Sequence, residues 1–218
     1  LVEGNSIRGC SRILQMTYKN TYRKFLWLTQ YMKKLKEQIP FKATDLYFDE
    51  METIHHTKCK PLSIALFVSE NYKILDMGVA QMPAKGRLAH FSREKYGIRP
   101  DERTTVRRLL ADKVQKNLIN SPQVIRTDAN PSYPPLIQEF FPTLKHEVFN
   151  REQKARLQEK LHEKIHKTVY DPLFPLNQRC AKLRSDIRRL TRRSWCTTKK
   201  IENLQGHLDL YLVSQYLF

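Results

Sequence analysis

The sequence predicts an α/β protein in which a mixed sheet is flanked by helices and preceded by a helical N-terminal segment. Apolar residues recur at three-to-four spacing up to about residue 39, and short β-rich runs begin near residue 42. Strand and helix patterns then alternate along the chain. With 218 residues, of which 40% are hydrophobic, the chain is long enough for one sizeable domain and a small accessory one.

The first 40 residues are expected to form two helices. The apolar pattern breaks at residues 15–17, and Pro40 closes the segment. Such a break is typical of a helix-turn-helix, whose second helix would place Lys19, Asn20 and Arg23 in a major groove of DNA. A plain helical hairpin would give much the same pattern, so both interpretations stay open.

The sequence pattern in the middle of the chain predicts five strands and the order in which they lie in the sheet. The expected strands cover residues 45–49, 62–69, 72–82, 123–128 and 144–149, and the expected helices cover about 104–118 and 132–140. This order favours three antiparallel strands that are extended by parallel strands through helical crossovers. The first strand then lies in the middle of the sheet, beside the fourth.

The C-terminal third is expected to be helical. A highly charged helix, read as a solvated arm, is expected over 151–168, an amphipathic helix over 175–193, and a last helix over about 199–216. On the amphipathic helix, Arg184, Arg188 and Arg192 recur four residues apart and should share a face.

The composition points to an anionic partner. The formal net charge is +17, from 39 Lys and Arg against 22 Asp and Glu, which favours nucleic acid or an anionic membrane surface. The membrane alternative is weak, because the longest nearly apolar run, 61–68, is far shorter than the roughly 20 residues of a spanning helix. We therefore expect no membrane partner and a cytoplasmic location.

The four cysteines are scattered, and no Cys-x-x-Cys pair occurs among them. Neither a disulfide framework nor a zinc ribbon is indicated, and we expect reduced, mostly buried thiols. The chain begins at Leu1 inside a helical pattern, so we also expect an upstream segment to be missing.

Two aspartates carry the clearest chemical signal. Asp49 follows the β-rich run 46–48, and Asp128 follows the run 124–127. A carboxylate at the carboxyl end of a strand lies beside the crevice where ligands bind in α/β sheets, and two carboxylates together can hold divalent cations. In so basic a chain, the natural substrate of such a pair is a phosphodiester. For either aspartate alone, a turn or a helix cap is the alternative.

Other metal motifs are weaker. His162, Glu163 and His166 match the zinc-protease helix pattern, but the segment is charged nearly throughout and no third ligand follows in a supporting context, so we reject it. A further candidate group, His55, His56 and Cys59, lacks a fourth partner, and we expect it in a loop near the aspartates.

Several segments along nearly the whole chain carry a family resemblance. They are Gly4-Asn5-Ser6-Ile7-Arg8, Arg12-Ile13-Leu14, Thr21-Tyr22, Phe48-Asp49-Glu50, Thr127-Asp128, Leu183-Arg184, Arg189-Leu190, Arg192-Arg193-Ser194 and Lys199-Lys200-Ile201-Glu202. With them the chain resembles a DDE-type insertion-sequence transposase of the RNase H-like fold, similar to transposases of the smallest bacterial insertion elements. The tail is the most specific part of the resemblance.

The resemblance implies an organisation and an activity. Residues 1–40 would form a helix-turn-helix DNA-binding segment, and residues 41–218 an RNase H-like catalytic domain with a helical arm at about 150–174. Two Mg²⁺ (or Mn²⁺) ions, held by Asp49, Asp128 and a third ligand, would support cleavage of DNA strands and their transfer to a target. Double-stranded DNA, as element ends and target, is the implied partner, and joining two ends implies a homo-oligomer on DNA.

The third ligand departs from the family pattern. The position of the usual catalytic glutamate falls on Asn177, whose carbonyl can ligate Mg²⁺ but brings no charge. The substitutes are Asp171, just before the same helix, and Glu202. Two other functions therefore remain open: a catalytically degenerate DNA-binding protein derived from a transposase, and a structure-specific nuclease, which would not transfer strands.

The remaining basic residues are expected to track a DNA backbone beside the metal site. They are Lys58, Lys60, Arg184, Arg188, Arg192, Arg193, Lys199 and Lys200. The alternative for them is a solvated charged face.

Overall fold

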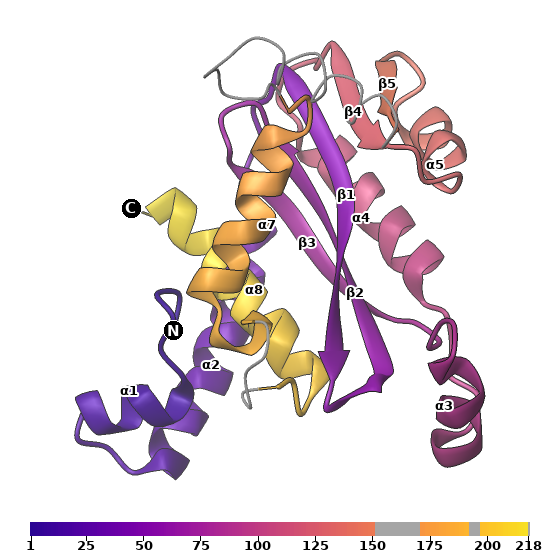
Figure 1. Cartoon of the computed structure of the whole chain (residues 1–218). Coiled ribbons are helices and arrows are strands. Elements are labelled where there is room, and N and C mark those ends of the chain that lie inside the picture. Colours follow the sequence, from indigo (N-terminus) through magenta and orange to yellow (C-terminus); the bar gives the residue numbers. More distant parts are fainter. Residues whose placement is uncertain (151–170, 192–196, 218) are drawn as a thin grey trace, which may run out of the picture.

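The computed structural model of the chain describes residues 1–150, 171–191 and 197–217 and contains a five-stranded mixed sheet flanked by helices (Figure 1). The helices and strands, in chain order, are α1 (Ile7–Ile13), α2 (Tyr18–Lys36), β1 (Asp45–His55), β2 (Thr57–Ser69), β3 (Ile74–Gln81), α3 (Leu88–Tyr96), α4 (Arg103–Asn117), β4 (Val124–Asp128), α5 (Tyr133–Phe140), β5 (Lys145–Phe149), α7 (Phe174–Asp186), the 3₁₀ turn η1 (Arg188–Leu190) and α8 (Ile201–Leu217). No helix among the described residues is long and apolar enough to cross a membrane.

The strand order is β3-β2-β1-β4-β5, which confirms the predicted order. The strands β1, β2 and β3 pair antiparallel, whereas β4 pairs parallel with β1 and β5 pairs parallel with β4. Arg126 of β4 ties the parallel strands together, because its guanidinium binds Asp45 Oδ2 at 2.5 Å and Glu147 Oε2 at 2.9 Å. The two neighbours of β4 are thereby fixed to it at the end where β1 begins.

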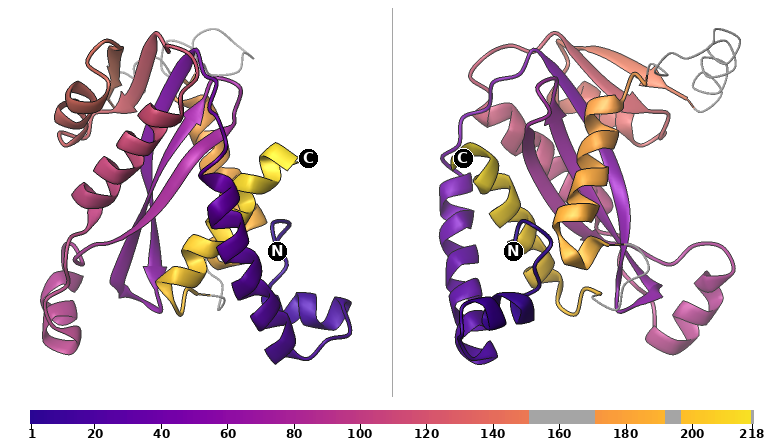
Figure 2. Two further views of the ribbon diagram at one scale, coloured as in Figure 1. Left: turned by 180° about the vertical axis from the view of Figure 1, so that it is seen from behind. Right: turned by 60° about the vertical axis from the view of Figure 1, so that its left-hand side comes forward.

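Each face of the sheet has its own core, because alternate residues of a strand point to opposite faces. Figure 2 shows α7 and α8 against one face and α4 and α5 against the other. Tyr47 and Met51 of β1 are buried with the residues of α7 and α8, and Leu46 and Phe48 with those of α4 and α5. Asp49 shares the parity of Tyr47 and Met51, so its side chain belongs to the α7 side.

Helix α2 is fastened to the sheet and to α8 by a buried cation. The Lys36 ammonium lies 2.6 Å from Asp76 Oδ1 on β3 and 2.7 Å from Asp209 Oδ1 on α8, and the three side chains are at most 8% exposed. Nearer the start of α2, the Phe25 ring packs on the His207 ring of α8, with 4.6 Å between the ring centroids. The N-terminal helices therefore share buried contacts with the body of the protein.

Two expectations from the sequence were wrong, and one helix was missed. Strand β1 does not end at Asp49 but continues to His55, and a tight turn at His56, with φ of 65°, leads into β2. The segment 175–193 is not one helix, because the backbone is extended at Ile187 (φ −103°, ψ 104°). Arg184 therefore lies on α7 while Arg188 belongs to η1.

The missed helix is α3, which lies apart from the helices that cover the sheet (Figure 1). Its contact with β2 includes Ser92, whose hydroxyl donates to the Cys59 carbonyl at 2.6 Å. The predicted arm at 151–168 lies outside the described residues. Cys10, Cys59 and Cys180 are free thiols, as expected, and the last two are buried.

Replacing Lys36 with Met should strongly destabilise the fold. The change leaves Asp76 and Asp209 buried without the cation between them, and breaking a buried ion pair in this way costs about 3–5 kcal/mol. Urea unfolding of Lys36→Met measures the loss. Lys34→Met on the exposed side of α2 is the control and should change the free energy of unfolding by less than about 0.5 kcal/mol. Equal stability of the two variants would contradict this role.

Candidate metal centre and basic surfaces

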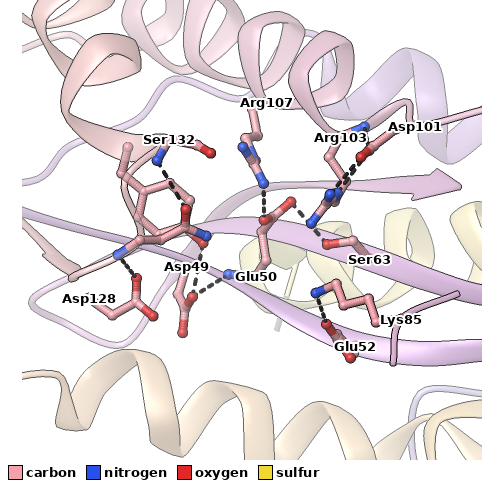
Figure 3. A network of polar contacts seen from close by, with 12 residues as sticks. Asp49, Glu50, Glu52, Ser63, Lys85, Asp101, Arg103, Arg107, Asp128 and Ser132 are labelled. Atoms are coloured by element: carbon pink, nitrogen blue, oxygen red, sulfur yellow. Dashed lines mark hydrogen bonds and ion pairs between the residues drawn. The ribbon is translucent and has the colours of Figure 1, made fainter. Parts of the chain in front are cut away.

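Asp49 and Asp128 meet where β4 ends beside β1. Phe48 pairs with Thr127, and the next residue on each strand is an aspartate. Both aspartates line a cleft of about 560 Å³, together with Asn130, Phe149, Asn150 and Leu173. Figure 3 shows the two carboxylates on the same side of the sheet. The structure thus places the two predicted residues on neighbouring strands, with Asp49 inside its strand rather than at its end.

The carboxylate of Asp49 is held by two donors. The Glu50 backbone N–H donates to Asp49 Oδ1 at 2.7 Å, and the Tyr133 hydroxyl donates to the same oxygen at 3.1 Å. The second oxygen, Oδ2, receives neither of these hydrogen bonds. These two hydrogen bonds therefore orient Asp49 through Oδ1.

Tyr133 is itself held from the other face of the sheet. Arg107 of α4 forms a buried ion pair with Glu50, 2.5 Å between Nη2 and Oε2, and its guanidinium lies 5.5 Å from the centre of the Tyr133 ring. The Ser63 hydroxyl donates to the other oxygen of Glu50 at 2.9 Å (Figure 3). The chain Glu50, Arg107, Tyr133 thus supports the position of Asp49.

A short turn places Asp128. Its Oδ1 accepts the Asn130 N–H at 3.0 Å, and Asn130 Oδ1 accepts the Ser132 N–H at 3.0 Å. Side chains of Asp and Asn commonly stabilise turns by binding the backbone two residues on. The same turn leads directly into α5 and so also delivers Tyr133, which is the first residue of that helix.

Burial and repulsion act on the ionisation of Asp49. Burial raises the pKa of Asp49 to about 6, and the negative charge of Asp128 adds to this shift, while the hydrogen bonds from Glu50 and Tyr133 oppose it. Burial, together with the negative charges of Asp49, Glu50 and Asp128, also raises the pKa of the Tyr133 hydroxyl. Tyr133 therefore keeps its proton and donates it in the hydrogen bond to Asp49. A divalent cation between the two carboxylates would replace their repulsion with attraction.

The expected third ligand does not join this pair. Asn177 is exposed on α7, and its Nδ2 donates to Asp171 Oδ2 at 2.5 Å. Asp171 also accepts the Leu173 N–H through Oδ1 at 3.0 Å in the turn before α7, and neither Asp171 nor Asn177 lines the cleft. Glu202 begins α8 near the far end of β1, where His55 pairs with Thr198.

The helix α7 instead carries a buried thiol whose ionisation is affected by the charge of Asp49. Cys180 lies one turn after Asn177 and is buried, and burial together with the charge of Asp49 raises its pKa to about 12. Within the described ranges 1–150, 171–191 and 197–217, no third carboxylate, thiol or imidazole completes a metal-binding group with the aspartates. Among the described residues, two acids therefore supply the negative charge at this centre.

Sequence reasoning missed two residues of the centre. Asn150 directly follows β5 and lines the cleft, so it carries the signal that singled out the aspartates, a polar side chain after a strand. Tyr133 carried no such signal, because its contact with Asp49 depends on how α5 leaves the turn after β4.

Four of the predicted DNA-contacting lysines lie at the opposite end of β1. Lys58 and Lys60 follow the β1–β2 turn, and Lys199 binds the adjacent His55 ring, 3.0 Å between its carbonyl oxygen and His55 Nε2. Lys200 is the next residue. Because Asp49 precedes His55 by six residues on β1, the two ends are separated by about 20 Å along the strand.

The expectation that these lysines flank the aspartates is therefore wrong, because β1 continues past the end of β4. His55, His56 and Cys59 lie at the same β1–β2 turn, within or beside the strands, and not in a loop near the aspartates. Among the other predicted contacts, Lys19, Asn20 and Arg23 are exposed on α2, Arg184 is half-buried on α7 and Arg188 is exposed. Arg192 and Arg193 lie outside the described residues.

No protein-family model and no curated protein matches the chain.

The raised pKa of Asp49 predicts a pH-dependent stability difference. Because the folded-state pKa of about 6 lies above the ordinary value of 3.8, the folded protein keeps this proton longer, and ionising Asp49 removes up to about 3 kcal/mol of stability as pH rises from 4 to 7. Asp49→Asn keeps the hydrogen-bond acceptor and removes the charge. The free energy of unfolding of Asp49→Asn minus that of the parent should therefore increase as pH rises from 4 to 7. Urea unfolding of both proteins at several pH values measures this difference.

Glu52→Gln is the matched control for this measurement. Glu52 lies on the same strand, is 60% exposed and pairs with the equally exposed Lys85 at 2.9 Å, so its stability difference from the parent should stay within about 1 kcal/mol at every pH. An Asp49→Asn difference that does not change with pH would show that Asp49 ionises at its ordinary pKa.

Proposed function

We propose that this chain is a DNA transposase, a metal-dependent polynucleotidyl transferase that cleaves DNA strands and transfers them. The observation that carries the proposal is the convergence of Asp49 and Asp128 from neighbouring strands into one cleft of a chain with net charge +17. The strand order β3-β2-β1-β4-β5, with three antiparallel strands first, is compatible with the RNase H-like fold that the sequence resemblance implies.

The donor set fits a hard divalent cation. Two carboxylates and the amide groups of Asn130 and Asn150 line the cleft, and oxygen donors are the ligands of Mg²⁺ and Mn²⁺. Such an ion, when bound, polarises a phosphodiester and lowers the pKa of an attacking water or 3′-hydroxyl. The resemblance implies two metal ions. The negative charge of the two carboxylates, however, balances only one divalent cation.

The protein's own groups have positioning roles in this proposal. Tyr133, held by Arg107, fixes one oxygen of Asp49, and the turn at Asn130 fixes one oxygen of Asp128. The carboxylates are thus pre-oriented, which limits the reorganisation needed when substrate binds. The basic turn at the far end of β1 and the basic helix α2 supply separate contacts for a DNA backbone.

The N-terminal helices have a recognition role in this proposal. Four residues, Leu14–Thr17, separate α1 from α2, and Lys19, Asn20 and Arg23 are exposed in the first turns of α2. This spacing suits a helix-turn-helix that reads the terminal repeats of an element. Joining two element ends requires at least two protomers on DNA.

A second function, a catalytically degenerate DNA-binding protein, is favoured by the geometry of α7. Asn177 is bonded to Asp171 and does not line the cleft, and the buried residue one turn later on α7 is the neutral thiol Cys180. A chain in which only two acids of the described residues meet at the cleft would bind a cation more weakly than one with three. The two functions share the DNA contacts and differ in turnover.

Strand cleavage and joining on a labelled element-end duplex, with Mg²⁺ or Mn²⁺, separates these functions. The parent should cut and join, and Asp49→Ala and Asp128→Ala should each reduce both activities by more than about 100-fold, since even outer-shell partners of metal ligands are worth about 10–100-fold. Asn177→Ala should retain activity within about threefold, because Asn177 lies outside the cleft. Glu202→Ala, at the far end of β1, is the control acid.

Each other outcome identifies a different function. A parent that binds the duplex but neither cuts nor joins, under either metal, would replace the transposase with the degenerate DNA-binding protein. Cutting without joining would indicate a structure-specific nuclease. A parent that binds no DNA at 50 mM salt would refute all three.

A further inference from the structure

One side of α2 carries a continuous exposed stripe. Its members recur three to four residues apart, and we call them the outward stripe: Asn20, Arg23, Lys24, Trp27, Tyr31 and Lys34. The opposite side of α2, with Phe25 and Lys36, is buried against α8 and β3. The stripe therefore belongs to a helix that is fixed in place from behind.

Two aromatic rings form the middle of the stripe. Trp27 is 65% exposed and Tyr31 is 48% exposed, and their rings are parallel within 2°, with 5.7 Å between the ring centroids. An open groove of about 490 Å³ continues from Trp27 along Lys24, Arg23 and Asn20. Single exposed aromatics are common on protein surfaces, whereas two stacked exposed rings, one of which lines a groove, favour a binding surface.

The charges around these rings have one sign. Residues 4–36 contain eight Lys and Arg and no Asp or Glu. Arg23, Lys24 and Lys34 are exposed on either side of the two rings. A partner that complements this surface carries regularly spaced negative charges and flat faces for stacking, which is the chemistry of a polynucleotide strand.

The position of the rings favours an unpaired strand over a duplex. A helix in the major groove contacts base edges mainly through its N-terminal residues, and base faces inside a duplex are covered by their neighbours. Trp27 lies nine residues after the first residue of α2, Tyr18, and Tyr31 lies one further turn along. Rings at these positions find base faces to stack on only where bases are unpaired.

We propose that the outward stripe of α2 binds single-stranded DNA, with unpaired bases stacked on Trp27 and Tyr31 and phosphates bound by Arg23, Lys24 and Lys34. The proposal deepens the proposed function and rests on it for the choice of DNA over RNA, since strand cleavage and transfer expose unpaired ends. In this arrangement the first turns of α2 contact the duplex and the later turns hold the separated strand.

Binding of fluorescein-labelled oligonucleotides to the full chain, followed by anisotropy in EDTA at several salt concentrations, tests this inference. The probes are dT12, rU12 and a 20-base-pair duplex. Trp27→Ala should weaken dT12 binding by about 5–150-fold, the range expected when one stacked base is lost, and duplex binding by less than about twofold. Trp27→Phe should restore most of the affinity, because a ring is still present.

Phe91→Ala is the matched control, because Phe91 is similarly exposed, at 49%, but lies on α3. It should leave dT12 binding unchanged, and thermal unfolding should confirm that all variants are folded. Tighter binding of dT12 than of rU12 supports DNA as the partner, and the reverse order would overturn that choice.

Three results would overturn the inference as a whole. The first is that Trp27→Ala and Tyr31→Ala leave dT12 binding unchanged. The second is that both variants weaken the binding of dT12 and of the duplex equally. The third is that they convert a dimer of the unliganded chain into monomers in sedimentation, which would assign the stripe to a second copy of the chain. EDTA prevents metal-dependent cleavage of the probes during the measurement. A chain that binds the duplex but not dT12 would refute only this inference, because duplex binding by itself agrees with the proposed function. A chain that binds neither form refutes the proposed function as well.

Discussion

The unequal lengths of β1 and β4 determine the geometry on which the candidate site depends. The two strands pair only over Asp45–Phe48 and Val124–Thr127, after which β4 turns away while β1 continues against β2. Among the described residues, β4 no longer pairs with β1 from Asp49 on, and Asp128 is the last residue of β4. The cleft forms at the corner where the two strands part, and the continuation of β1 carries the basic turn at His56 about 20 Å away.

Electrostatics gives this corner its chemical character. Two carboxylates from neighbouring strands line one cleft in a strongly basic protein, and no Lys or Arg of α7 lines this cleft. Burial and the charge of Asp128 hold the pKa of Asp49 near 6, so at neutral pH the ionised pair has a cost in stability. An unpaired charge that a protein retains at such a cost is often functional, because a ligand relieves it. A divalent cation is the simplest ligand that would do so.

Much of the fold was predictable because its signals are local. The β-rich runs and their order specified a sheet with β1 in the middle, and the aspartates after two of those runs specified the corner. The length of β1 was not predicted, because the expected strand ended at residue 49 and the charged residues Glu50 and Glu52 follow. Glu50 is in fact buried by Arg107 from α4, a partner 57 residues away that no local pattern reveals.

The positions of the candidate third ligand and of the basic residues depend on contacts between distant parts of the chain. The position of the family's catalytic glutamate falls on Asn177, whose side chain is bonded to Asp171 and does not line the cleft. Lys199 and Lys200 looked close to the aspartates only while β1 was assumed to end at Asp49. The docking of α2 also depends on distant partners, since Lys36 is buried between Asp76 and Asp209.

The most direct test of the account is whether a divalent cation binds between Asp49 and Asp128. Anomalous diffraction from crystals soaked in Mn²⁺ at pH 7.5 locates the ion without any assumption about activity. The account predicts a peak within bonding distance of both carboxylates in the parent and its loss in Asp49→Asn crystals. Mn²⁺ bound elsewhere on the protein, with no density between these two aspartates, would contradict it.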